Sequence, residues 1–99
     1  MDGLFFDWDE NKNQLNQQKH DGITFEESAT VFEDENALVE FDTEHSDYEE
    51  RFRILGLSCM NNLLIVVHCI RNENTIRIIS ARKATKTERK GYEERSRAL

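Results

Sequence analysis

Histidine, glutamate and arginine side chains are the groups in this sequence that could carry out chemistry, and together they suit a phosphodiester. Cleavage of RNA by its own 2′-hydroxyl needs a base, an acid, and cations that stabilise the added charge on phosphorus. Arginine suits the last task because its guanidinium can hold phosphate through two hydrogen bonds. The candidate proton-transfer groups are His20, His45, His68, Glu49, Glu50 and Tyr92, and the candidate cations are Arg51, Arg53, Arg77, Arg82 and Lys83.

Most of these residues also have a structural interpretation. His20 closes a weak helix, where the helix dipole favours an imidazolium, so capping explains it as well as catalysis. His68 lies in an apolar stretch and fits a core histidine better than a catalytic one. His45 lies in an acidic loop, which predicts a solvated side chain. Arg82 and Lys83 could equally close the end of a sheet beside acidic loops.

Motifs of several other enzyme classes are absent. The sequence has no glycine-rich phosphate loop, HExxH, CxxC or Gly-x-Ser-x-Gly motif. Cys59 and Cys69 lack the spacing of a zinc site, so we expect two reduced thiols and neither a metal nor another cofactor. On residue types alone, ribonuclease is one of several possible activities.

Length and composition predict one small domain over residues 1–99. The chain has 37% hydrophobic and 33% charged residues, enough for one modest core. No apolar run approaches the roughly 18 residues of a membrane span, and the first residues show no secretion signal. We therefore expect a cytoplasmic protein that does not contact a membrane.

The two halves of the chain carry opposite net charge. Residues 1–50 contain two basic and sixteen acidic residues, for a net charge of −14, whereas residues 51–99 contain eleven basic and four acidic ones, for +7. The acidic half could suit a basic protein and the basic half a nucleic acid. The alternative is that the two halves neutralise each other within the fold. Charge alone does not favour either interpretation over the other.

Capping signals predict three helices. Asp9 is a candidate N-cap for a helix reaching Lys19, with Leu15 as its apolar anchor and Gly22 beyond its end. Thr24 begins a second, short helix over residues 25–32, and Thr85 begins the last one. Both threonines have a glutamate three residues later, which is the capping-box pattern.

Strands are expected between and before these helices. A short strand covers residues 4–8, and further strands cover 37–42, 51–58, 63–71 and 75–82. In the strand expected over residues 51–58, alternation puts Phe52, Ile54 and Gly56 on one face. Arg51, Arg53 and Leu55 then lie on the other face. We predict an α+β fold: an antiparallel sheet of about four strands, flanked by two N-terminal helices and a C-terminal helix.

Four segments resemble the BrnT family of toxins from type II toxin–antitoxin systems: FDWDENK, KHDGITFEESATVFED, EHSDYEERF and IRIISARKATKTERKGYEE. They follow the family's order and cover residues 5–94, and SARKAT followed by ER and YE is the most specific segment. The resemblance implies a RelE-like fold with a basic groove for RNA. It also implies a metal-independent endoribonuclease that inhibits translation and growth.

The resemblance further implies a partner and a set of site residues. The partner would be an antitoxin with a ribbon-helix-helix DNA-binding domain, which covers the toxin in a hetero-oligomer and through which alone the pair would contact operator DNA. From the matched motifs we expect the catalytic residues Arg82, Glu50, His20 and Arg51 and the RNA-binding residues Arg77, Lys83, Tyr92 and Trp8. Residue type alone adds His68 as a further catalytic candidate and Arg53 as a further RNA-binding one.

Departures from the family pattern leave two alternatives open. His68 stands where a tyrosine is common, Leu57 stands where a basic residue is usual, and the first helix has few cations. Lost cations would weaken a groove for RNA. One alternative is therefore a degenerate, non-catalytic toxin fold that acts as a co-repressor or a protein-interaction module. A weaker one is direct binding of DNA by the last helix.

Overall fold

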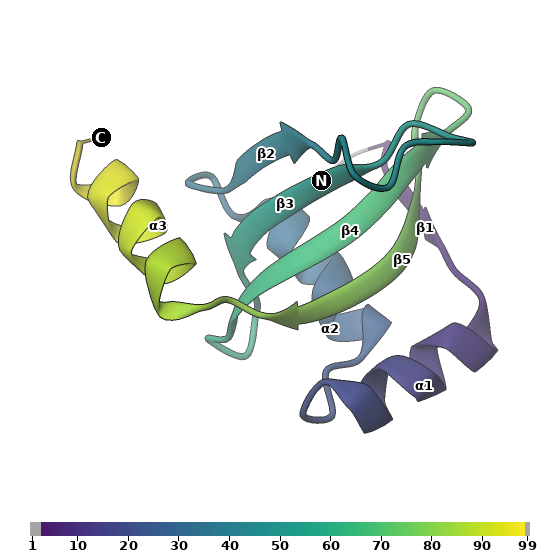
Figure 1. Ribbon diagram of the computed structural model, residues 1–99, viewed down its shortest axis with the longest axis horizontal. Coiled ribbons are helices and arrows are strands. Elements are labelled where there is room, and N and C mark those ends of the chain that lie inside the picture. The colour runs from purple at the N-terminus through teal and green to yellow at the C-terminus, as the bar shows by residue number, and fades with distance from the viewer. Residues whose placement is uncertain (1–2, 99) are drawn as a thin grey trace.

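The computed structural model describes residues 3–98, so the first two residues, where a secretion signal would begin, lie outside it. Its elements confirm the α+β class and the predicted order of helices and strands (Figure 1). They are β1 (Phe5–Asp7), α1 (Glu10–Lys19), α2 (Phe25–Ala29), the 3₁₀ helix η1 (Thr30–Glu33), β2 (Leu38–Phe41), β3 (Phe52–Leu57), β4 (Leu63–Arg71), β5 (Thr75–Lys83) and α3 (Lys86–Ala98).

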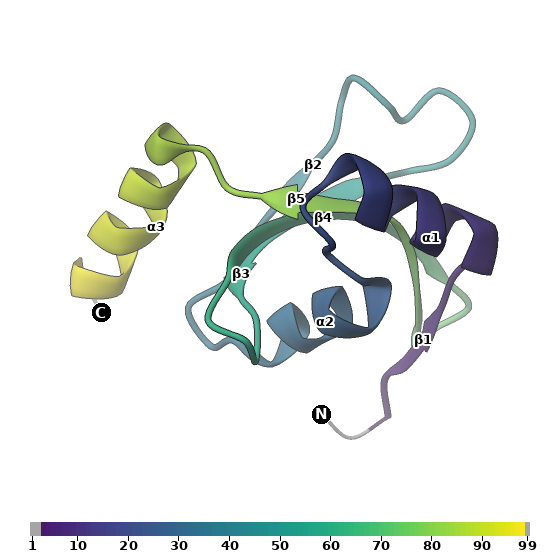
Figure 2. The ribbon, with the colours of Figure 1, turned by 90° about the horizontal axis from the view of Figure 1, so that it is seen from below.

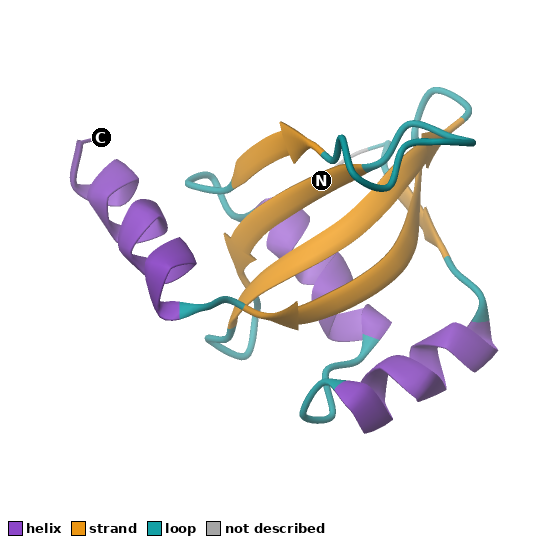
Figure 3. Cartoon of the chain, in the orientation of Figure 1, coloured by secondary structure: helices purple, strands orange, loops and turns teal. Residues whose placement is uncertain are grey.

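The strands form one five-stranded sheet in the order β1-β5-β4-β3-β2 (Figure 3). Strands β2 to β5 pair antiparallel, as the predicted four-stranded meander requires. The short first strand adds a fifth member, because β1 pairs parallel with β5 and makes the sheet mixed. The last strand of the meander therefore lies inside the sheet and is not an edge.

The register between β4 and β5 decides which polar residues share a face. Val67 pairs with Ser80 but His68 pairs with Ile78, so Ile79 is skipped in a β-bulge. Because of this bulge, Arg82 and Arg77 lie on the same face although they are five positions apart.

One face of the sheet, here called the α2 face, carries most of the core. Helix α2 lies against the concave side of the sheet (Figure 2). Phe25 and Val31 are fully buried there against Ile54, Val66 and Ile78. On the opposite side, here called the open face, Tyr92 of α3 packs at one end on a small cluster of Leu55, Leu63 and Ile65.

Helix α1 attaches through amides rather than through the predicted apolar anchor. The Leu15 side chain is 49% exposed, whereas Asn13 and Asn16 are buried. The Asn16 side chain donates to the carbonyls of Ile23 and Ala81 at 3.0 and 2.9 Å and accepts from the Ala81 N–H at 3.0 Å. The expected role of Leu15 is wrong because polar contacts, which hydrophobic periodicity does not register, fix this helix on β5.

The predicted caps are present. Asp9 accepts from the N–H groups of Asn11 and Lys12 at the start of α1, and Thr24 accepts from the N–H of Glu27. No helix within residues 3–98 is long and apolar enough to cross a membrane.

Candidate functional site

A hollow of about 370 Å³ lies on the open face of the sheet, where segments far apart in the sequence meet. Arg53 of β3 and Arg82 of β5 contribute cations, and His20 contributes an imidazole from the end of α1. The loop between β2 and β3 supplies Asp42, Glu44 and His45. Figure 2 shows this loop on the side of the sheet opposite α2.

Strand register explains why the two arginines converge. Arg53 pairs with Val67 and Arg82 pairs with Ile65, so both point from the open face on either side of β4. His20 reaches the same hollow because Asn16 ties the last turn of α1 to the backbone of β5.

Arg82 is held in a fixed orientation by α3. Its Nη1 and Nη2 lie 2.8 and 3.0 Å from the two carboxylate oxygens of Glu88. The same carboxylate accepts the N–H of Thr85 at 2.8 Å, completing the predicted capping box. Hydrogen bonds from Arg82 lower the pKa of Glu88 to about 2, against the cost of partial burial. The cap of α3 and the clamp on the arginine are therefore one unit.

The other arginines on or beside the open face are also paired with carboxylates. Their shortest N–O distances range from 2.6 to 3.5 Å. The pairs are Arg51–Glu49, Arg53–Glu40, Arg71–Glu49 and Arg77–Asp7. All of these carboxylates come from residues 1–50, so the acidic half neutralises part of the basic half within the fold.

Several expected site residues lie elsewhere. His68 is buried on the α2 face, where its Nδ1–H donates to the Val66 carbonyl at 3.2 Å and its ring contacts Phe32 and Phe52. Burial lowers its pKa, which favours the neutral imidazole. Trp8 packs edge-on against Phe25, on the same α2 face.

Lys83 and Glu50 are exposed and do not line the hollow. Lys83 pairs with Leu64, so it points to the face opposite Arg82. Tyr92 lies at the far end of the open face, where its hydroxyl donates to Asp34 at 2.5 Å. Burial and this hydrogen bond raise the pKa of Tyr92 to about 12, so it remains a proton-bearing donor.

The structure adds two residues to the site: His45, which the sequence-based interpretation expected to be only solvated, and Asp42, which it did not consider. His45, expected to be solvated, places its Nδ1 at 3.0 and 3.2 Å from the two oxygens of the Asp42 carboxylate, and Asp42 is only 1% exposed. The available signal was their spacing of three residues at the edge of the EHSDYEERF segment.

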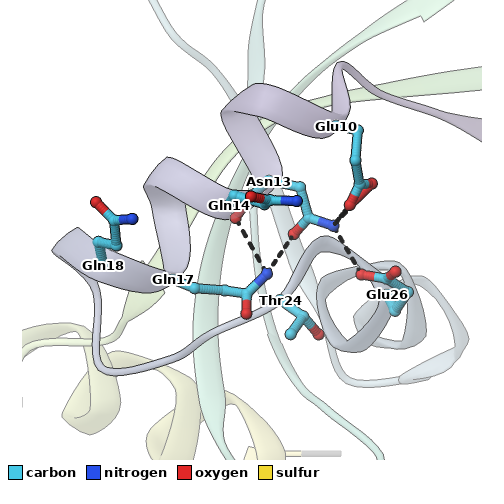
Figure 4. A pocket seen from close by; sticks show the side chains of 7 residues that line it. All are labelled: Glu10, Asn13, Gln14, Gln17, Gln18, Thr24 and Glu26. Carbon is cyan, nitrogen blue, oxygen red and sulfur yellow. Dashed lines mark hydrogen bonds between the residues drawn. The ribbon is translucent and has the colours of Figure 1, made fainter.

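A larger hollow of about 630 Å³ lies between α1 and the start of α2 (Figure 4). Its lining contains Glu10 and Glu26, both of which accept hydrogen bonds from the Asn13 amide, together with glutamine side chains. Among the described residues, no arginine, lysine or histidine lines it, so this part of the chain does not supply the groups that a phosphate would need. Elsewhere, Cys59 is exposed and Cys69 is buried, and both are free.

Comparison with known proteins decides the family. A family model described as "Ribonuclease toxin, BrnT, of type II toxin-antitoxin system" matches residues 8–88. The chain belongs to the BrnT toxin family. BrnT toxins are the ribonuclease component of type II systems, so a cognate antitoxin is the partner.

A solved structure agrees with the BrnT assignment at the level of the fold. The crystal structure of the Brucella abortus ribonuclease toxin BrnT, at 1.1 Å resolution, superposes with a TM-score of 0.61 at 20% sequence identity. The match covers 84% of this chain and 99% of the Brucella chain. None of the curated proteins compared with this chain matches it significantly.

Proposed function

We propose that this BrnT-family protein is a metal-independent endoribonuclease that cleaves RNA through its own 2′-hydroxyl and thereby inhibits translation and growth. The observation that carries the proposal is the convergence of Arg53, Arg82 and His20 on one hollow of the open face. In such a site the arginines bind the phosphate and stabilise the charge that develops on it, while the imidazole takes the 2′-hydroxyl proton.

Arg82 has the central role in this proposal. The Glu88 carboxylate fixes the plane of its guanidinium, which reduces the rotamer freedom lost when a phosphate binds. Arg53 lies across β4 and provides the second cation. Lys83 faces away, so its place in the proposal is at most peripheral.

RNA outside the cleaved phosphate would lie along a second, shallow hollow beside the first. Arg51, Tyr48 and His45 line it together with the carboxylates of Glu44, Asp47 and Glu49, and Tyr48 is fully exposed. An exposed aromatic ring beside a cation suits base stacking, a role for which Trp8 and Tyr92 are poorly placed. Glu50 follows in the same loop and stays a predicted proton-transfer group without a contact in this hollow.

The proposed partner is an antitoxin with a ribbon-helix-helix domain, in a cytoplasmic hetero-oligomer that binds operator DNA through the antitoxin. Membership of a type II family supports the antitoxin itself. Isolation of the complex and sequencing of the bound chain test its class, and a partner without that domain would contradict this part of the proposal.

The activity is tested with purified protein freed of antitoxin, in the presence of a chelator, on a short labelled RNA. We expect a 2′,3′-cyclic phosphate product, and no cleavage at a position carrying a 2′-deoxy sugar. Arg82→Gln should reduce the rate by about 100-fold or more, because it removes charge stabilisation of the transition state.

Arg89→Gln is the matched control, since it makes the same change on an exposed part of α3 away from the hollow. Equal rates for Arg82→Gln and the parent chain, with both folded, would contradict the role of Arg82. Cleavage that depends on added metal would contradict the metal-independent mechanism.

One observation favours a second candidate, a non-catalytic toxin fold that acts through protein contacts. The arginines of the open face are all engaged by carboxylates, which weakens their attraction for RNA. Expression without the antitoxin separates the two: growth arrest with cleaved RNA supports the enzyme, and normal growth with intact RNA supports the binding module.

A further inference from the structure

The Asp42–His45 pair is a carboxylate–imidazole pair of the kind that can transfer a proton. A buried carboxylate needs a hydrogen-bond partner, and within residues 3–98 the side chain that donates to Asp42 is the imidazole of His45. Because a carboxylate only accepts, Nδ1 of His45 must carry the proton in this contact. Its other nitrogen, Nε2, is bonded to no side chain of the described residues and belongs to a ring that is 61% exposed and lines the hollow.

The loop that carries His45 is closed by its own hydrogen bonds. The N–H of Asp42 donates to the Arg51 carbonyl at 2.8 Å, which pins the two ends of the loop together. Between them, Ser46 donates through its hydroxyl to the Asp42 carbonyl at 2.6 Å and accepts the Arg51 N–H at 3.0 Å. The imidazole is therefore held over the open face by a defined loop.

The groups around His45 are those that a phosphate would meet. Besides Asp42, the hollow presents the charged groups Arg53, Arg82 and Glu44, and the second imidazole, His20. Two imidazoles beside two arginines supply both proton-transfer partners and the cations for one phosphodiester. The Asp42 carboxylate holds Nδ1 of His45, whereas no carboxylate pairs with His20 among residues 3–98.

We propose that His45 is the general acid of the RNA cleavage proposed above and that Asp42 is its positioning residue. The 2′-oxygen forms a bond to phosphorus while the bond from phosphorus to the 5′-oxygen breaks. His20 takes the proton of the 2′-hydroxyl, and Nε2 of His45 gives its proton to the departing 5′-oxygen. The products are a 2′,3′-cyclic phosphate and a free 5′-hydroxyl, and no oxidant or further reactant is needed.

A substrate whose leaving atom is sulfur tests the assignment, because a thiolate leaves without being protonated. Two RNAs are compared, one with the natural 5′-oxygen and one with a bridging 5′-sulfur at the cleaved position. His45→Gln should slow cleavage of the oxygen substrate by about 100-fold or more and of the sulfur substrate by less than about tenfold.

Asp42→Asn tests the positioning role. Glu73→Gln is its matched control, because it makes the same change at an exposed carboxylate that lines neither hollow of the open face. We expect Asp42→Asn to lower kcat more than it raises KM, because the imidazole of His45 loses the hydrogen bond that orients it. In a His45→Gln background, Asp42→Asn should have no further effect on cleavage of the oxygen substrate. Circular dichroism verifies that each variant is folded.

The outcomes separate this inference from the ribonuclease proposal on which it rests. A parent chain that cleaves neither substrate overturns the ribonuclease activity itself. An active parent chain whose His45→Gln variant loses equal factors on both substrates, or loses less than about threefold on the oxygen substrate, overturns only the assignment of His45. An additive loss from Asp42→Asn in the double variant overturns the positioning role of Asp42.

Discussion

The Glu88 carboxylate accepts hydrogen bonds from both terminal nitrogens of Arg82 and from the backbone N–H of Thr85. One side chain thus caps α3 and fixes the arginine in the candidate site. The pKa of Glu88 falls from 4.5 to about 2 on folding. A carboxyl group with a depressed folded-state pKa adds stability above its unfolded pKa and loses it as the pH falls toward the folded value.

We predict that Glu88→Gln lowers the free energy of unfolding by about 1 kcal/mol at pH 7, a value reduced for the partial exposure of the pair. Glutamine still suits a capping box, so the change isolates the charge. Urea unfolding at several pH values measures the effect, and the difference from the parent should shrink between pH 4.5 and pH 2. A difference that persists unchanged at pH 2 would contradict the prediction, and Glu93→Gln on the exposed side of α3 serves as control.

At the scale of elements, α1 depends on a single buried amide for its attachment to the sheet. Asn16 satisfies three buried backbone groups, two of them on Ala81 of β5. We predict that Asn16→Ala destabilises the domain by about 2–3 kcal/mol, because these groups lose their partners. Leu15→Ala should cost less than about 1 kcal/mol, since that side chain is half exposed. Denaturant unfolding measures the free energy of unfolding of both variants. A larger loss for Leu15→Ala than for Asn16→Ala would contradict the prediction.

This contrast shows what the sequence could and could not predict about the elements. Capping residues and alternation are local, so the starts of α1 and α3 and the two faces of β3 were predicted correctly. The parallel pairing of β1 with β5 and the bulge after Val67 depend on contacts between distant segments. Hydrophobic patterns carry no information on such contacts, which is why the anchor of α1 was misassigned.

In the candidate site, too, some residues could be predicted from the sequence and others could not. Arg53 and Arg82 were predicted, and the fold brings them together. Alternation could already have separated Lys83 from Arg82, because neighbouring residues of a strand point to opposite faces. The pairing of Asp42 with His45 required the loop to close through Ser46, a geometry that residue types alone do not specify.

For the whole molecule, the opposite charges of the two halves have a definite arrangement. Carboxylates from the first half, together with Glu88, lie beside the arginines of the open face, so the basic surface is masked but not removed. A phosphate must displace or share these partners to bind. The acidic residues therefore compete with RNA phosphates for these arginines. This local effect is separate from their contribution to the net charge.

Replacing two of these competitors should strengthen RNA binding. We predict that Glu40→Gln combined with Glu49→Gln, which frees Arg53, Arg51 and Arg71, lowers the Kd for a 2′-O-methyl RNA by roughly three- to tenfold at low salt. Because more cations then meet phosphates, the slope of log K against log salt should steepen by roughly one to two units. Fluorescence anisotropy at several salt concentrations measures both quantities.

Net charge alone would also strengthen binding, so the control must change it equally. Glu93→Gln combined with Glu94→Gln removes the same two charges from exposed positions of α3 that pair with no arginine of the open face. Its effect should be smaller and should leave the salt slope near that of the parent chain, because no further guanidinium is released. Equal changes in the two double variants would show that the carboxylates act only through the overall field, and local masking of the arginines would then be wrong.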